Sequence, residues 1–126
     1  MQNRARKKIV AAVEDLFFTV KISDAARRAG FDVEFVKSEH DLLEKAKEMP
    51  ALIVVDLNLG SFGPVKVIAK LKDNPVLKAI SVIAYVSHVQ GELKQQAHDA
   101  GANMVLARSA FTQNFPQILR RHSGAI

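Results

Sequence analysis

The chain of 126 residues contains no cysteine. This absence excludes a disulfide framework, a zinc site with cysteine ligands and a thiol nucleophile. No apolar run approaches the roughly 20 residues that a helix needs to span a bilayer, so we expect no contact with a membrane. The basic N-terminus is not followed by a long apolar segment with a small-residue cleavage site, so a signal peptide is not expected. We therefore expect a cytoplasmic protein.

The net charge of +5 comes from the two ends of the chain. Of the 18 basic side chains, four lie within residues 4–8 and two at positions 120–121, and no acidic residue lies beside them. Residues 9–119 carry the other 12 basic side chains and all 13 acidic ones. The body of the domain is thus nearly neutral. The basic ends are interpreted as solvated termini, and nucleic acid is not expected as a partner.

The most informative segment is the apolar run at residues 51–55, which leads directly into Asp56. A continuous branched run of this kind is typical of a strand buried on both faces of a parallel sheet. Ligands of open α/β sheets bind at the carboxyl ends of such strands, which makes Asp56 the first candidate for chemistry. The alternative is that Asp56 only turns the chain after the strand, because Asp is common in turns.

Strands and helices alternate along the chain. The expected strands are residues 8–13, 32–36, 51–56, 80–86 and 104–107. Apolar residues at helical spacing lie between the strands and predict helices there, and Met49 is expected to be the last buried residue of the second helix. The last helix is expected to start near Asn114, because a helix tolerates a proline such as Pro116 only in its first turn. This order predicts a single α/β domain, a flavodoxin-like (βα)5 doubly wound sheet with strand order 2-1-3-4-5. Residues 1–7 and 122–126 are expected to be flexible tails.

In that topology the first and third strands are neighbours, so Glu14 and Asp15 should meet Asp56 at one edge of the sheet. Converging carboxylates repel one another unless one is protonated or a cation neutralises them. Oxygen ligands of this kind suit Mg²⁺, and a carboxylate beside Mg²⁺ can accept a phosphoryl group. The alternative is an acidic rim that is merely solvated.

The chain resembles the receiver domain of two-component response regulators from Lys8 to about Arg121. The matching segments are Glu14-Asp15, Val54-Val55-Asp56-Leu57-Asn58 and Gly101-Ala102-Asn103.

This resemblance implies that Asp56 accepts phosphate from a sensor histidine kinase or phosphotransfer protein. It implies Mg²⁺ bound by Glu14, Asp15 and Asp56, with a backbone oxygen from Asn58. It also implies a module that catalyses at most its own phosphorylation and dephosphorylation.

The sequence departs from the family at two functional positions. The family has Thr or Ser at the end of the fourth strand, where this chain has Val86, which cannot donate a hydrogen bond to phosphate. Ser87 is a possible hydroxyl substitute, although neighbouring strand residues face opposite sides. Arg108 occupies the position at which the family has a lysine, so a planar guanidinium with several N–H donors replaces a compact ammonium group.

Three functions remain open. The first is a stand-alone phosphorylated receiver that signals by contacting a downstream protein through its fourth helix, fifth strand and fifth helix. Such a receiver could also form a homodimer. The second is a pseudo-receiver, an interaction module that phosphorylation does not regulate. The third is a flavin or nucleotide binder, which the first strand–helix turn disfavours because residues 14–18 are acidic and apolar and lack the glycines of a phosphate cradle.

Overall fold

The computed structural model describes residues 7–87 and 91–122. Its elements are β1 (Lys7–Ala12), α1 (Leu16–Arg28), β2 (Phe31–Phe35), α2 (Glu39–Ala46), β3 (Leu52–Asp56), α3 (Pro64–Asp73), the 3₁₀ helix η1 (Leu77–Ala79), β4 (Ser81–Val86), α4 (Gly91–Asp99), β5 (Met104–Ala107) and α5 (Arg108–His122). The strands form one parallel sheet in the order β2-β1-β3-β4-β5, which confirms the predicted flavodoxin-like topology.

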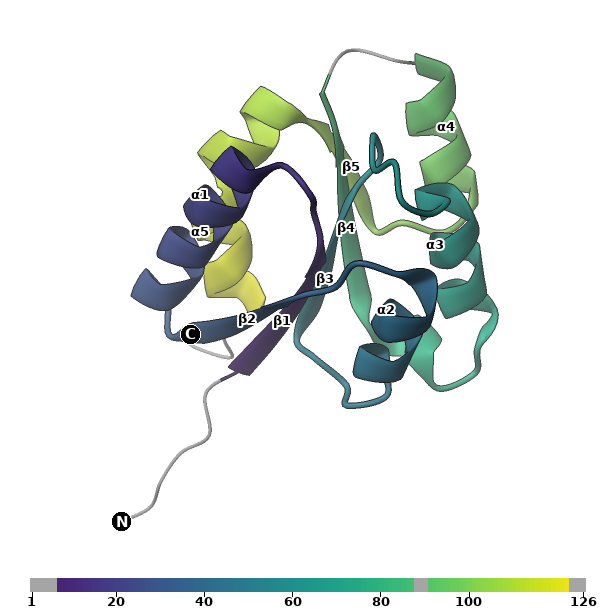
Figure 1. Ribbon diagram of the computed structural model, residues 1–126, viewed down its shortest axis with the longest axis horizontal. Coiled ribbons are helices and arrows are strands. Elements are labelled where there is room, and N and C mark those ends of the chain that lie inside the picture. The colour runs from purple at the N-terminus through teal and green to yellow at the C-terminus, as the bar shows by residue number, and fades with distance from the viewer. Residues whose placement is uncertain (1–6, 88–90, 123–126) are drawn as a thin grey trace.

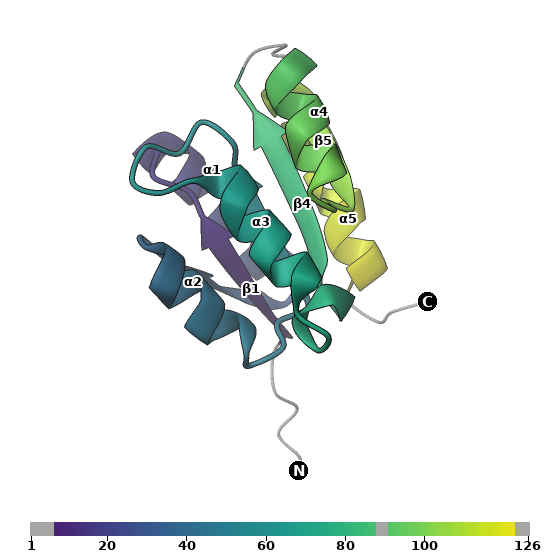
Figure 2. The ribbon, with the colours of Figure 1, turned by 90° about the vertical axis from the view of Figure 1, so that its right-hand side faces the viewer.

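The sheet lies between two layers of helices. Helices α1 and α5 cover one face, and α2, α3 and α4 cover the other (Figures 1 and 2). Each face has its own apolar core, because β1, β3 and β4 alternate buried side chains between the two layers. The central strand β3 is buried along its whole length, as its unbroken apolar run predicts for a strand covered on both faces.

Strand register determines which side chains meet at the carboxyl edge of the sheet. Ala12 pairs with Val55, so the turn after β1 begins level with the end of β3. Asp56 pairs with Tyr85, and Val86 pairs with Ala107, the residue before Arg108. The turn into α1, the end of β3 and the start of α5 therefore lie side by side.

Local sequence signals explain most of the element boundaries. The hydroxyl of Ser38 accepts a hydrogen bond from the Asp41 amide (3.0 Å) and caps α2, as its spacing predicts. Gly30 and Gly101 follow α1 and α4 with φ values of 87° and 110°, a left-handed conformation that glycine adopts without strain.

Some sequence expectations were wrong. Helix α5 begins at Arg108, not near Asn114, and Pro116 lies inside it. Helix α2 ends at Ala46, so Met49 does not join its buried stripe and is 46% exposed. Lys7 and His122, assigned to flexible tails, belong to β1 and α5, and the rest of both tails lies outside the described residues.

No helix in the described ranges is both long enough and apolar enough to cross a membrane.

Candidate functional site

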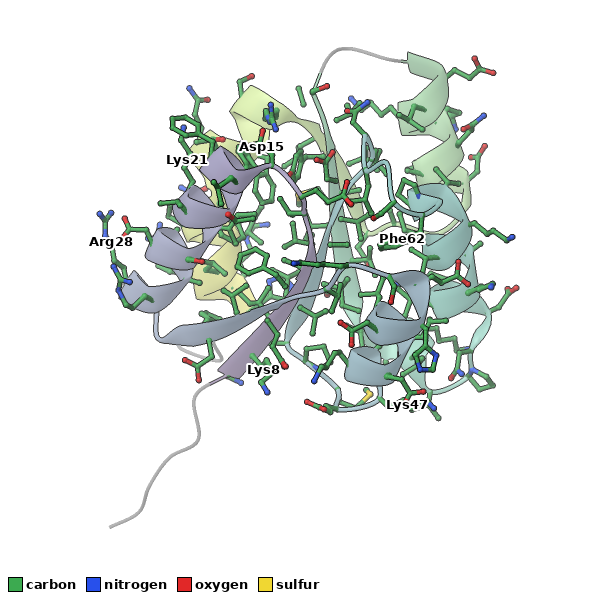
Figure 3. All side chains as sticks on the ribbon, viewed as in Figure 1. Lys8, Asp15, Lys21, Arg28, Lys47 and Phe62 are labelled. Carbon is green, nitrogen blue, oxygen red and sulfur yellow. The ribbon has the colours of Figure 1, made fainter. Side chains whose placement is uncertain are left out.

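Asp15 lies where the chain passes from β1 into α1 (Figure 3), and its carboxylate is the N-terminal cap of that helix. One oxygen, Oδ1, accepts the Phe18 amide at 3.2 Å. The other, Oδ2, accepts a hydrogen bond from Nη2 of Arg108 at 2.7 Å. These two donors, the amide first, hold the pKa of Asp15 below its ordinary value, because both stabilise the ionised form.

The guanidinium of Arg108 is enclosed by aromatic rings. Its central carbon lies 4.7 Å from the centroid of the Phe18 ring and 5.9 Å from that of Tyr85. A planar cation over aromatic faces gains attraction from the ring quadrupoles. The Arg108 side chain is 34% exposed, so the ion pair with Asp15 is partly shielded from water.

Asp56 is the one charged residue in the described part of the chain that is buried, with 7% of its surface exposed. Its Oδ1 accepts the Asn58 amide at 2.8 Å. Burial raises the pKa of Asp56, while the Asn58 amide and the charge of Arg108 act in the opposite direction. Asp15 also acts on this pKa, in the raising direction, by charge repulsion.

Tyr85 is a neighbour of Asp56 that the sequence analysis did not name as a site residue. Its ring packs between Phe18 and Phe111, with centroids 4.7 and 4.9 Å away. Its hydroxyl is buried without a well-formed hydrogen bond among the described residues. Burial and the nearby charge of Asp56 raise the pKa of Tyr85, which keeps the phenol protonated. The pairing of the third and fourth strands was the available signal, since it places Tyr85 directly beside Asp56.

Glu14 points into the loop after β3. Its Oε1 accepts the Gly60 amide at 3.1 Å, and the Ser61 hydroxyl and the Gly60 amide lower the pKa of Glu14. Glu14 is therefore engaged by the loop after β3, whereas Asp15 is engaged by α1 and Arg108. Ser61 was not expected at the site, because only the loop conformation brings it to Glu14.

The side chain of Asn58 connects the loop after β3 to the end of β4. Its Oδ1 accepts both the amide and the hydroxyl of Ser87, at 2.8 and 2.9 Å. The Ser87 hydroxyl thus donates to Asn58. Val86 is 1% exposed and packs in the apolar core on the α3 and α4 face, whereas Tyr85 packs in the core of the opposite face. Val86 offers no polar group to the site.

The acidic residues can be tested as ligands for the Mg²⁺ that the fold suggests. Mg²⁺ requires nearly octahedral oxygen ligands and usually binds one or two carboxylates. Both Asp15 oxygens already accept protein donors, and one of them is 2.7 Å from a guanidinium nitrogen. Within residues 7–87 and 91–122, no three His, Cys, Asp or Glu side chains gather as metal ligands. As arranged, Asp15 does not suit the ion, because the guanidinium of Arg108 lies against its Oδ2 and would repel a second cation.

A groove of about 710 Å³ opens beside the ion pair. Asp15, Lys21, Ser87 and Arg108 line its polar part, together with the first turn of α5. Three large apolar side chains of α1, those of Leu16, Phe17 and Val20, stand exposed at 79%, 75% and 63%.

Comparison with known proteins shows no matching family model and no matching curated sequence. Solved structures do match. A putative response regulator from Chloroflexus aurantiacus superposes with a TM-score of 0.82 at 17% identity, covering 96% of this chain and 100% of the other. The phosphorylated cyanobacterial phytochrome response regulator RcpA gives 0.77 at 23% identity, with 93% and 91% covered. The Mn²⁺-bound response regulator Rcp1 gives 0.79 at 16% identity, with 95% and 96% covered.

These full-length superpositions define the class: this chain has the receiver fold of two-component response regulators. Within that class, the particular features of this chain are a valine at the end of β4 and an arginine paired with the acidic turn after β1.

Proposed function

We propose that this chain is a pseudo-receiver, a signalling module of receiver fold that acts by contact with another protein and is not switched by phosphorylation. The observation that carries the proposal is the ion pair between Arg108 and Asp15. This pair places a fixed positive charge on the carboxylate that, by the resemblance, would hold Mg²⁺ for phosphoryl transfer.

Two contacts at the end of β4 support the same function. Val86 packs in the core and has no hydroxyl for a phosphoryl oxygen. Ser87 donates to Asn58 and thereby ties the end of β4 to the loop after Asp56. A phosphoryl group on Asp56 would have no donor at Val86 through which to move the segment after β4.

The apolar residues of α1 are the proposed contact surface. Leu16, Phe17 and Val20 are exposed on one helix, whereas no large exposed hydrophobic residue lies on the described parts of α4, β5 or α5. Exposed apolar patches of this kind mark protein interaction sites. The proposed contact surface is therefore α1, and not the face of α4, β5 and α5 that was expected from the sequence.

A second candidate is the phosphorylated receiver, with Asp56 as acceptor and Mg²⁺ on Glu14, Asp15, Asp56 and Asn58. Its support is the position of Asp56 at the carboxyl end of β3, within electrostatic reach of Asp15. It requires a kinase or phosphotransfer partner, and it requires Mg²⁺ to bind Asp15 beside the positive charge of Arg108.

Incubation with a small phosphodonor and Mg²⁺, followed by intact-mass measurement, separates the two candidates. We expect no stable phosphoryl adduct on this chain under conditions in which RcpA, which is known in a phosphorylated form, is modified. A stable adduct that disappears in Asp56→Asn would contradict the pseudo-receiver and establish the second candidate.

A further inference from the structure

We infer that the guanidinium of Arg108 is the resident cation of the acidic pocket and takes the place of a divalent ion on Asp15. This inference deepens the proposed function, because a cation that belongs to the chain holds the pocket in one charge state. It rests on three observations: the hydrogen bonds of Asp15, the packing of the Arg108 guanidinium, and the charges that act on the neighbouring carboxylates.

The first argument is that both carboxylate oxygens of Asp15 are engaged by donors of the chain. Its two oxygens accept one backbone amide and one guanidinium nitrogen, at 3.2 and 2.7 Å. A charge-assisted bond of this length is among the stronger hydrogen bonds in proteins. A divalent ion at Asp15 Oδ2 would bind beside the guanidinium of Arg108 and would be opposed by its positive charge.

The second argument is that the guanidinium is held from several sides. It lies against the rings of Phe18 and Tyr85, and its Nη2 donates to Asp15. Arg108 is also the first residue of α5, immediately after β5, so its backbone is fixed at the edge of the sheet. A lysine at this position would keep the positive charge, but it would lose the planar arrangement of N–H donors and the stacking of the guanidinium on the aromatic rings.

The third argument is the distribution of negative charge. Glu14 is engaged by the Gly60 amide in the loop after β3, whereas the charge of Arg108 acts on both Asp15 and Asp56. Arg108 is in contact with Asp15 and its charge acts on Asp56. One fixed guanidinium therefore serves both carboxylates, the task that a metal would otherwise perform.

The test is a titration of the whole chain with Mg²⁺, followed by the amide signals of Asp15 and Asp56 in two-dimensional NMR spectra. We expect no saturable shift in the wild-type chain. Arg108→Lys should bind Mg²⁺ at least about tenfold more tightly than wild type, because lysine can swing away from Asp15. Mn²⁺, added in trace amounts as a paramagnetic probe, should broaden the same signals in Arg108→Lys only.

Lys21→Ala is the matched control. It removes one positive charge from the same groove, and Lys21 is placed over the ring of Phe17, not on Asp15. We expect this variant to behave like the wild-type chain, whereas Asp15→Asn added to Arg108→Lys should abolish the new binding. The inference fails if wild type binds Mg²⁺ as tightly as Arg108→Lys, or if Lys21→Ala gains the same affinity.

Arg108→Ala is a second route to the same answer, and it should also gain Mg²⁺ binding. If that variant does not fold, the comparison of wild type with Arg108→Lys decides the inference alone. No phosphodonor is present in these titrations. Tight Mg²⁺ binding by the wild-type chain would therefore contradict the proposed role of Arg108. The proposed function would still be tested separately, by the phosphodonor experiment.

Discussion

At the scale of single residues, the burial of Asp56 should make stability depend on pH. Its raised pKa means that the folded chain binds this proton more readily than the unfolded chain. Ionised Asp56 therefore destabilises the fold, and this penalty develops as pH rises above the ordinary value of 3.8 through the folded pKa. Asp56→Asn keeps an oxygen for the Asn58 amide, and it should raise the free energy of unfolding by about 1 kcal/mol at neutral pH.

Urea denaturation at a series of pH values measures this effect. The gain in Asp56→Asn should shrink toward zero as the pH falls toward the ordinary pKa of aspartate. Asp15→Asn is the control of opposite sign, because the Phe18 amide and Arg108 lower the pKa of Asp15. Its stabilising contribution is present above the ordinary pKa and is lost as the pH falls through the lowered one. If the gain in the free energy of unfolding of Asp56→Asn does not vary with pH, the gain does not come from the ionisation of buried Asp56.

The sequence located the acidic residues of the site but not their partners. A buried strand that runs into Asp56, and an acidic pair after the first strand, place both groups at the carboxyl edge of any parallel sheet of this order. The contact of Arg108 with Asp15 joins residues 93 positions apart. It depends on the rotamer of a long side chain and on the packing of Phe18, neither of which a residue pattern specifies.

At the scale of elements, Pro116 should weaken α5. It lies within the helix and lacks the amide that would bond to the carbonyl of Thr112. Pro116 is exposed, so its replacement does not disturb the core. Pro116→Ala should raise the free energy of unfolding by about 1 kcal/mol or more, since proline inside a helix costs up to about 3 kcal/mol relative to alanine.

Thermal unfolding followed by circular dichroism checks this prediction, and Gln117→Ala is the matched control at a neighbouring exposed position. That control should change the free energy of unfolding by less than about 0.5 kcal/mol. A destabilised Pro116→Ala would show that the proline fixes a bend that the packing of α5 requires.

The two wrong expectations about helices have different causes. Pro116 was expected to limit α5 to a start near Asn114, but Phe111 and Phe115 are buried against the sheet and keep the earlier turns helical. Met49 fitted the apolar spacing of α2, yet the chain leaves the helix at Ala46 and Met49 adopts a φ of 55°. Tertiary packing overrides local propensity in the first case, and a local turn overrides apolar periodicity in the second.

At the scale of the whole molecule, the two sides of the sheet differ in what they expose. Helix α1 presents Leu16, Phe17 and Val20 to solvent, next to a groove of about 840 Å³ that Leu16, Val20 and Phe35 help to line. The near neutrality of residues 9–119 offers little electrostatic attraction to a nucleic acid. The shape and polarity of the molecule therefore favour a protein partner that covers α1.

An apolar surface that lacks its partner should associate weakly with further copies of the chain. We expect sedimentation velocity to show concentration-dependent association of the purified protein, reduced in Phe17→Lys because a charge then lies at the centre of the α1 surface. Val76→Lys is the matched control, since Val76 is 64% exposed but lies just before η1, away from α1. If association is driven by α1, it must respond to a charge on α1 and not to one near η1. A strictly monomeric wild-type chain would therefore mean that α1 is not the contact surface, and so would an equal effect of Phe17→Lys and Val76→Lys.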